Sequence, residues 1–290
     1  NDNGIVVLLH VPDGANIQLG TSLQSVVAQL DGSSSSSTLS INLHSTASEA
    51  KAVSIGTFKV EDANHLVLHS DGAAGISNTV NTLMVSSLSD LKITSDASLS
   101  IKGIVGITEA NLQSVTIDAS GLNGNFTLDA SQIVDSVTGG RSVIIIGGDG
   151  NDVLTNTVAS EDITLSGGDG IDTFCVGAGA YGVTITDLTK GETVRVGNGS
   201  VQNTLVDTAN LQGADQSHLN SLSLTNAASS AATVAGYSGT HQSVLFVQNN
   251  ETYVFFDADG NHHFDAVADA IVHLLGVVSA SELAHVNLLS

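Results

Sequence analysis

Short apolar steps, in which one residue separates two hydrophobic ones, recur in this chain from about Val53 onward and constrain its fold most strongly. They lie at residues 66–68, 91–93, 99–101, 115–117, 126–128, 143–145, 163–165, 183–185 and 194–196, with Ser, Thr, Asp or Gly within two residues after each. Alternation with a period of two is typical of strands that bury one face. The strands follow at irregular intervals, which favours a parallel β-solenoid or β-roll whose rungs stack on one another. An antiparallel sandwich of similar short strands is the alternative.

The composition agrees with a mainly β fold. Apolar residues make up 41% of the chain, but aromatic residues only 3%, and there is no Trp, so the core must consist of Val, Ile, Leu and Ala. The chain has 30 glycines and a single proline, Pro12. Together with many Ser, Thr, Asn and Asp residues, this composition predicts short strands joined by tight turns.

The charge balance excludes two classes of partner. The chain carries 29 acidic and 7 basic residues, a formal net charge of −22. Nucleic-acid binding and docking of a basic patch on an anionic membrane both need Lys and Arg clusters, which are missing from the sequence. Membrane insertion is not expected either, because no apolar run reaches the roughly 18 residues of a spanning helix.

The single cysteine, Cys175, excludes an internal disulfide. It lies in an apolar stretch, where we interpret it as a small buried residue and not as a reactive thiol. A surface or secreted protein without disulfides needs another stabilising cross-link, and a metal ion is the obvious one.

Three regions are predicted along the chain. Residues 1–55 form an N-terminal segment with one short helix, because Leu23, Val26, Val27 and Leu30 follow helical spacing. Residues 56–200 form the β-solenoid, and residues 201–290 form a smaller C-terminal β module.

The C-terminal module contains a predicted hairpin. Residues 244–247 and 252–256 read as strands, and residues 248–251 as the turn between them. Residues 267–275 fit a helix, residues 271–275 fit a strand equally well, and periodicity does not decide between the two.

Two nine-residue stretches, 147–155 and 167–175, match the repeat G-G-x-G-x-D-x-U-x, in which U is a large apolar residue. Glycines let the loop curl its carbonyl groups inward, and the aspartates add hard oxygen ligands for calcium. The spacing of 20 residues predicts that the loops stack on the same edge of the roll and share an ion; ordinary Gly/Asp turns are the alternative. The candidate ligands are Gly147, Asp149, Gly150, Asp152, Gly167, Asp169, Gly170 and Asp172.

An acidic loop in the C-terminal module is a second candidate calcium site. Asp257, Asp259, Asn261 and Asp265 occupy positions 1, 3, 5 and 9 of an EF-hand-like loop. The loop departs from that pattern because position 12 is an alanine, and the acid Asp269 comes one place later. A polar turn without an ion is the alternative.

We predict no catalytic site. The ten histidines are scattered, with no H-E-x-x-H pattern, and there is no nucleophile elbow, P-loop or dinucleotide fingerprint. Adjacent acids such as Glu161 and Asp162 point to opposite faces of a strand, so they make a poor acid–base pair.

The two nonapeptides, the acidic composition and the strand ladder together resemble the RTX proteins of Gram-negative bacteria, and within them the calcium-dependent S-layer proteins. Residues 115–120 and 126–131, which run into the first nonapeptide, are similar to that class, as is the ending at residues 253–261 followed by 271–277. The likeness covers roughly residues 55 to 290. The chain departs from the family in having only two nonapeptides and in having a cysteine.

The resemblance implies Ca²⁺ as the bound ion and type I secretion through an uncleaved C-terminal signal. It also implies folding outside the cell and self-assembly into a lattice at the cell surface. Cell-surface polysaccharide is a further expected partner, through a region outside this chain. The first alternative is the C-terminal part of a surface adhesin or biofilm protein. The second is the export module of an RTX enzyme.

Overall fold

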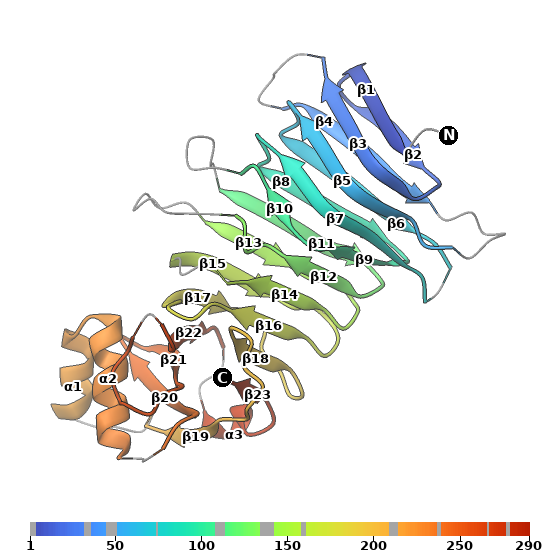
Figure 1. Cartoon of the computed structure of the whole chain (residues 1–290). Coiled ribbons are helices and arrows are strands. Elements are labelled where there is room, and N and C mark those ends of the chain that lie inside the picture. Colours follow the sequence, from blue (N-terminus) through green and yellow to red (C-terminus); the bar gives the residue numbers. More distant parts are fainter. Residues whose placement is uncertain are drawn as a thin grey trace. The chain divides into compact units, whose positions relative to one another are not determined.

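The computed structural model describes residues 4–31, 36–44, 51–73, 75–107, 114–133, 142–157, 161–208, 214–236, 239–265, 267–276 and 279–290. In this part of the chain the protein is mainly β, with parallel strands stacked in sheets and three short helices (Figure 1). Its contacts divide it into two compact units. Unit 1 comprises residues 1–155 with 167–170, and unit 2 comprises residues 156–166 with 171–290.

Unit 1 consists of two sheets that receive successive strands in turn. The first sheet has the order β1 (Ile5–Val11), β3 (Leu23–Leu30), β5 (Ser54–Glu61), β7 (Ser77–Val85), β9 (Ser98–Ile101), β12 (Phe126–Asp129) and β14 (Val153–Asn156), with β10 (Ile104–Val105) beside β7. The second has the order β2 (Ala15–Leu19), β4 (Thr38–His44), β6 (His65–Asp71), β8 (Asp90–Ser95), β11 (Val115–Leu122) and β13 (Val143–Ile146).

The predicted parallel ladder is confirmed, and the antiparallel alternative is wrong for these strands. Every pair within the two sheets of unit 1 for which a register is described is parallel. Side chains at matching positions stack from rung to rung. One such column in the second sheet consists of Leu39, Leu66, Leu91, Ile117 and Ile145, and all five are fully buried. These columns form the aliphatic core that the composition requires.

The predicted N-terminal helix is wrong, because the segment forms strand β3. Val26, Ala28 and Leu30 are buried at a spacing of two, which is a strand pattern. The strand also has parallel neighbours on both sides, β1 and β5. The helical spacing of the larger apolar residues was a coincidence that sheet pairing overrides.

Unit 2 combines parallel rungs with an antiparallel module. Its strands are β15 (Glu161–Ser166), β16 (Thr173–Val176), β17 (Gly182–Ile185), β18 (Thr193–Val196), β19 (Thr204–Asp207), β20 (Gln242–Gln248), β21 (Glu251–Asp257), β22 (Ala270–Leu274) and β23 (Asn287–Leu289). One sheet has the order β16-β18-β23, and the other has the order β15-β17-β22-β21-β20-β19. The predicted hairpin is confirmed as β20 and β21, and the undecided segment forms the antiparallel strand β22.

Two helices of unit 2 were not expected from the sequence. The helices α1 (Ala214–Ser221) and α2 (Leu224–Ala235) pack on the antiparallel strands, and the third, α3 (Ala280–Leu283), is a single turn. The alanines of α2 and side chains of β20, β21 and β22 share one buried cluster: Leu219, Ala227, Ala228, Ala231, Ala232, Val244, Phe246, Phe255 and Ile271. No helix in the described part of the chain is long and apolar enough to cross a membrane.

Candidate metal centre

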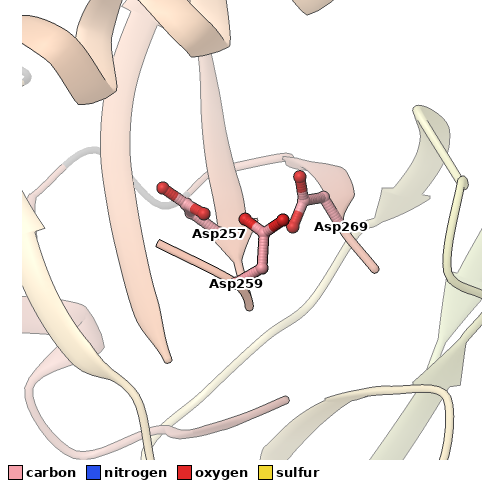
Figure 2. Close-up of side chains that lie close together, drawn as sticks. All are labelled: Asp257, Asp259 and Asp269. Carbon is pink, nitrogen blue, oxygen red and sulfur yellow. The ribbon is translucent and has the colours of Figure 1, made fainter. Parts of the chain in front are cut away.

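Three aspartates of unit 2 converge at the ends of two paired strands. Asp257 ends β21, and Asp269 directly precedes β22. Because Phe256 pairs with Ala270 in this antiparallel ladder, Asp257 and Asp269 lie opposite each other just beyond its last pair. Asp259 completes the group, and one ligand atom from each of the three carboxylates lies within 4.8 Å of the others (Figure 2). We call Asp257, Asp259 and Asp269 the acidic cluster.

Backbone N–H groups of the loop hold two of these carboxylates in place. Asp257 accepts hydrogen bonds from the N–H groups of Gly260 at 2.7 Å and His262 at 3.0 Å. Asp269 accepts from the N–H groups of Ala258 and Asp265, both at 3.0 Å. Both side chains are fully buried, whereas Asp259 is exposed. The cluster therefore consists of two buried carboxylates with fixed positions and one carboxylate that is exposed to solvent.

Gly260 is required by the shape of this loop. Its φ is +75°, in the left-handed region that favours glycine. A Cβ atom at this position would also lie 2.2 Å from the carbonyl oxygen of Gly239. The loop can therefore turn back toward Asp257 only with glycine here.

The electrostatics of the acidic cluster disfavour three negative charges without a counter-ion. Burial raises the pKa of Asp269 to about 7, and the neighbouring carboxylates of Asp257 and Asp265 add to the rise. Burial also raises the pKa of Asp259, again with Asp265 and Asp257 contributing. A cation would favour the charged forms and relieve this repulsion.

The other two predicted ligands of the loop, Asp265 and Asn261, also make hydrogen bonds within it. Asp265 accepts hydrogen bonds from the N–H groups of Ala268 and Val267, both at 2.9 Å, and these bonds lower its pKa. Asn261 donates to Asp259 at 2.8 Å and accepts from the N–H of His263. The EF-hand-like pattern has an alanine, Ala268, at position 12 in place of an acid. Asp269, one residue later, supplies the third carboxylate of the acidic cluster.

The loop is tied to two neighbouring segments of unit 2. The N–H of Phe264 donates to the Ser229 hydroxyl of α2 at 2.9 Å. The carbonyl of Asp269 accepts from Gly179 at 2.6 Å, next to β17. An ion bound here would therefore act on the packing of β21, β22, β17 and α2 together.

The two glycine loops of unit 1 stack as the spacing of 20 residues predicts. The N–H of Asp169 donates to the carbonyl of Gly148 at 2.9 Å. A Cβ atom would lie 2.1 Å from the Gly167 carbonyl if placed on Gly147, and 2.2 Å from the Gly150 carbonyl if placed on Gly170. These glycines are thus needed because the two loops approach each other closely.

The aspartates of the glycine loops do not gather as those of the acidic cluster do. Asp152 is buried and accepts from the N–H groups of Phe126 and Gly148, both at 2.7 Å. Asp149 and Asp169 are exposed, and Asp172 is buried in unit 2. Among the described residues, the acidic cluster is the one group of three such side chains close enough to share an ion.

A second polar constellation, not anticipated from the sequence, lies on unit 2. Thr184 Oγ1 is 3.1 Å from His273 Nδ1, and His273 Nε2 is 2.8 Å from Glu251 Oε2. The order resembles a nucleophile–base–acid relay, but β17, which carries Thr184, is paired on both sides, with β15 and β22. Its ladder N–H groups are therefore engaged in strand pairing. The relay joins three neighbouring strands.

No family model matches the chain, and no curated protein matches it in sequence.

Proposed function

We propose that this chain is a calcium-dependent extracellular structural protein that self-assembles into a bacterial surface layer, without enzymatic activity. The observation that carries the proposal is the acidic cluster, in which three carboxylates converge and two of them are buried and held in place by backbone N–H groups. The resemblance to RTX-type S-layer proteins supports the role and type I secretion.

Calcium is the ion that suits this cluster best. The three side chains offer only hard oxygen atoms, with no His nitrogen or Cys sulfur within the group. Ca²⁺ takes six to eight oxygen ligands in flexible geometry, and backbone carbonyls and water complete such shells. Zinc prefers nitrogen and sulfur ligands, so the donor set argues against it.

The stacked glycine loops are proposed as a second, weaker calcium region. The backbones of Gly147–Gly150 and Gly167–Gly170 approach each other closely, and a shared ion would require such stacked loops. Asp152, however, already satisfies two backbone N–H groups. We therefore expect the acidic cluster to bind first as calcium is added.

The experiment is a calcium titration of the whole chain, followed by sedimentation and negative-stain microscopy. We expect small species in chelator and extended ordered arrays at calcium concentrations on the order of millimolar, the weak end of calcium sites. An adhesin fragment or an enzyme export module would bind calcium and remain small. That result would contradict the surface-layer role while leaving the calcium site intact.

A further inference from the structure

Histidines and aspartates gather on the outer face of the second sheet of unit 1. His65, His69 and Asp71 lie on β6, His44 lies on β4, and Asp90 lies on β8. Their positions alternate with the buried residues of the same strands, so all five side chains point away from the core. The parallel ladder of β4, β6 and β8 brings these residues together, although they are scattered in the sequence (Figure 1). We call the five residues the histidine–aspartate face.

Two ion pairs join neighbouring strands within this face. His44 and Asp71 are register partners, and His44 Nδ1 lies 3.8 Å from Asp71 Oδ2. His65 and Asp90 are register partners as well, and His65 Nδ1 lies 3.9 Å from Asp90 Oδ1. The four side chains are between 30% and 48% exposed, so protons from the solvent reach both pairs.

Asp71 keeps its negative charge at mildly acidic pH. Burial opposes this charge, but hydrogen bonds from Ser95 and Asn42 and the nearby imidazoles of His69 and His44 lower the pKa of Asp71 below the ordinary aspartate value. Histidine is the side chain that ordinarily gains its charge between about pH 8 and about pH 5. Mild acidification therefore charges histidines beside a carboxylate that stays ionised.

The other charges around this face do not reverse the attraction. Lys92 of β8 and Asp118 of β11 are register partners, so these opposite charges face each other. On the far side of β4, strand β2 has no ionisable side chain. Three acids lie in the connections next to these strands: Asp13, Asp62 and Asp96. Further carboxylates add to the attraction for a charged imidazole.

We propose that the histidine–aspartate face is a pH-sensitive device that strengthens the ladder of unit 1 when the medium becomes mildly acidic. Charged imidazoles bind Asp71 and Asp90 across β4, β6 and β8, whereas neutral imidazoles at higher pH do not attract them. The inference goes beyond the proposed function, because these residues lie outside both proposed calcium regions and the device needs no ion.

The pairs stabilise the fold at acidic pH and not at alkaline pH. Each pair attracts only while its histidine carries a proton, so its contribution is lost as pH rises through the histidine range. The net charge changes in the same direction. Protonation of all ten histidines would add ten positive charges and bring the net charge from −22 to −12, which reduces the repulsion within the chain.

A double-mutant cycle on His65 and Asp90 tests one pair directly. The wild type, His65→Gln, Asp90→Asn and the double variant are unfolded as whole chains in urea, with chelator and little salt. At about pH 5.5, where histidine is ordinarily charged, the two sites should be coupled by roughly two- to fivefold in the equilibrium constant for unfolding. At about pH 8, where histidine is ordinarily neutral, the coupling should vanish.

His285→Gln is the matched control, because His285 is an exposed histidine of unit 2. It should show no coupling to Asp90→Asn at either pH. Coupling of equal size at both pH values would indicate a hydrogen bond that does not depend on charge. Coupling at neither pH would mean that the His65–Asp90 pair contributes nothing. Either result would overturn the proposal.

Replacing His44, His65 and His69 together with glutamine tests the whole face. In chelator, the rise in melting temperature from about pH 8 to about pH 5.5 should be smaller in this triple variant than in the wild type, by roughly 3 °C or more. Protons bound by the acidic cluster contribute equally to both proteins and cancel in the comparison. An equal rise in both proteins would contradict the proposal. Because calcium is absent, neither outcome bears on the proposed calcium sites.

Discussion

Asp269 is the residue whose protonation most directly controls the acidic cluster. Its pKa of about 7 in the folded state lies far above the ordinary aspartate value. The fold without an ion therefore holds this proton more tightly than the unfolded chain does, and it loses stability as pH rises from about 4 to about 7. A bound cation needs the carboxylate form and opposes that loss.

We therefore predict that calcium affinity rises with pH until about pH 7 and then levels off. If one proton must leave, affinity should fall about tenfold per pH unit below the pKa of Asp269. Isothermal titration calorimetry between about pH 5.5 and pH 8 measures this slope. Asp269→Asn should bind more weakly and lose most of the slope, and an affinity independent of pH in the wild type would contradict the assignment.

Asp152 gives a second prediction at this scale. It is buried and accepts two backbone hydrogen bonds, so Asp152→Ala leaves two buried N–H groups without their acceptor. We expect a loss of about 2–5 kcal/mol in the free energy of unfolding in chelator. Asp149 is exposed, so Asp149→Ala should stay within about 0.5 kcal/mol. Equal losses in denaturant titrations would show that Asp152 has no such structural role.

Among the elements, the stacked glycine loops make a prediction about close approach. Gly168 has φ of +91°, and a Cβ atom there would lie 2.3 Å from the carbonyl oxygen of Gly148. Gly14 has φ of +75° but has no atom within 4 Å of such a Cβ. Both alanine variants share the left-handed backbone strain of about 1–2 kcal/mol. Only Gly168→Ala must also push two loops apart.

We thus expect Gly168→Ala to lower the free energy of unfolding at least twice as much as Gly14→Ala, measured by thermal and denaturant unfolding. Similar losses for the two variants would mean that the loops are not packed as closely as the distances indicate.

The elements also show how far the sequence could be interpreted. The alternation of hydrophobic and polar residues predicted the parallel strands, because each strand of the ladder shows the same alternation. Residues 23–30 satisfied helical and strand spacing together, and only the neighbouring strands β1 and β5 decide between them. Helix α2 was missed because its buried face consists of small alanines, so this Ser- and Ala-rich stretch shows no row of large apolar residues at helical spacing.

The acidic cluster was predicted in part for a related reason. Asp257 and Asp259 follow a local loop pattern, which the sequence displays directly. The role of Asp269 depends on β22 pairing antiparallel with β21, which places it opposite Asp257. The sequence left residues 267–275 undecided between helix and strand, so this contact could not be derived from it.

At the scale of the whole molecule, charge and ion binding are linked. A net charge of −22 opposes compact folding and association, and every bound Ca²⁺ removes two units of it. Binding to the folded state alone adds about 2.7 kcal/mol of stability at a calcium concentration 100 times the Kd. Calcium should therefore both raise the melting temperature and permit assembly, with the acidic cluster as the first site to fill.

The most direct test of the calcium assignment is isothermal titration calorimetry of calcium into the whole chain at about pH 7.5, above the pKa of Asp269. We predict that Asp259→Asn abolishes the tightest binding event. Asp96→Asn, which changes an exposed aspartate of unit 1, should leave that event unchanged. Binding that is identical in the wild type and Asp259→Asn, or no binding in the wild type, would contradict a calcium site at Asp257, Asp259 and Asp269.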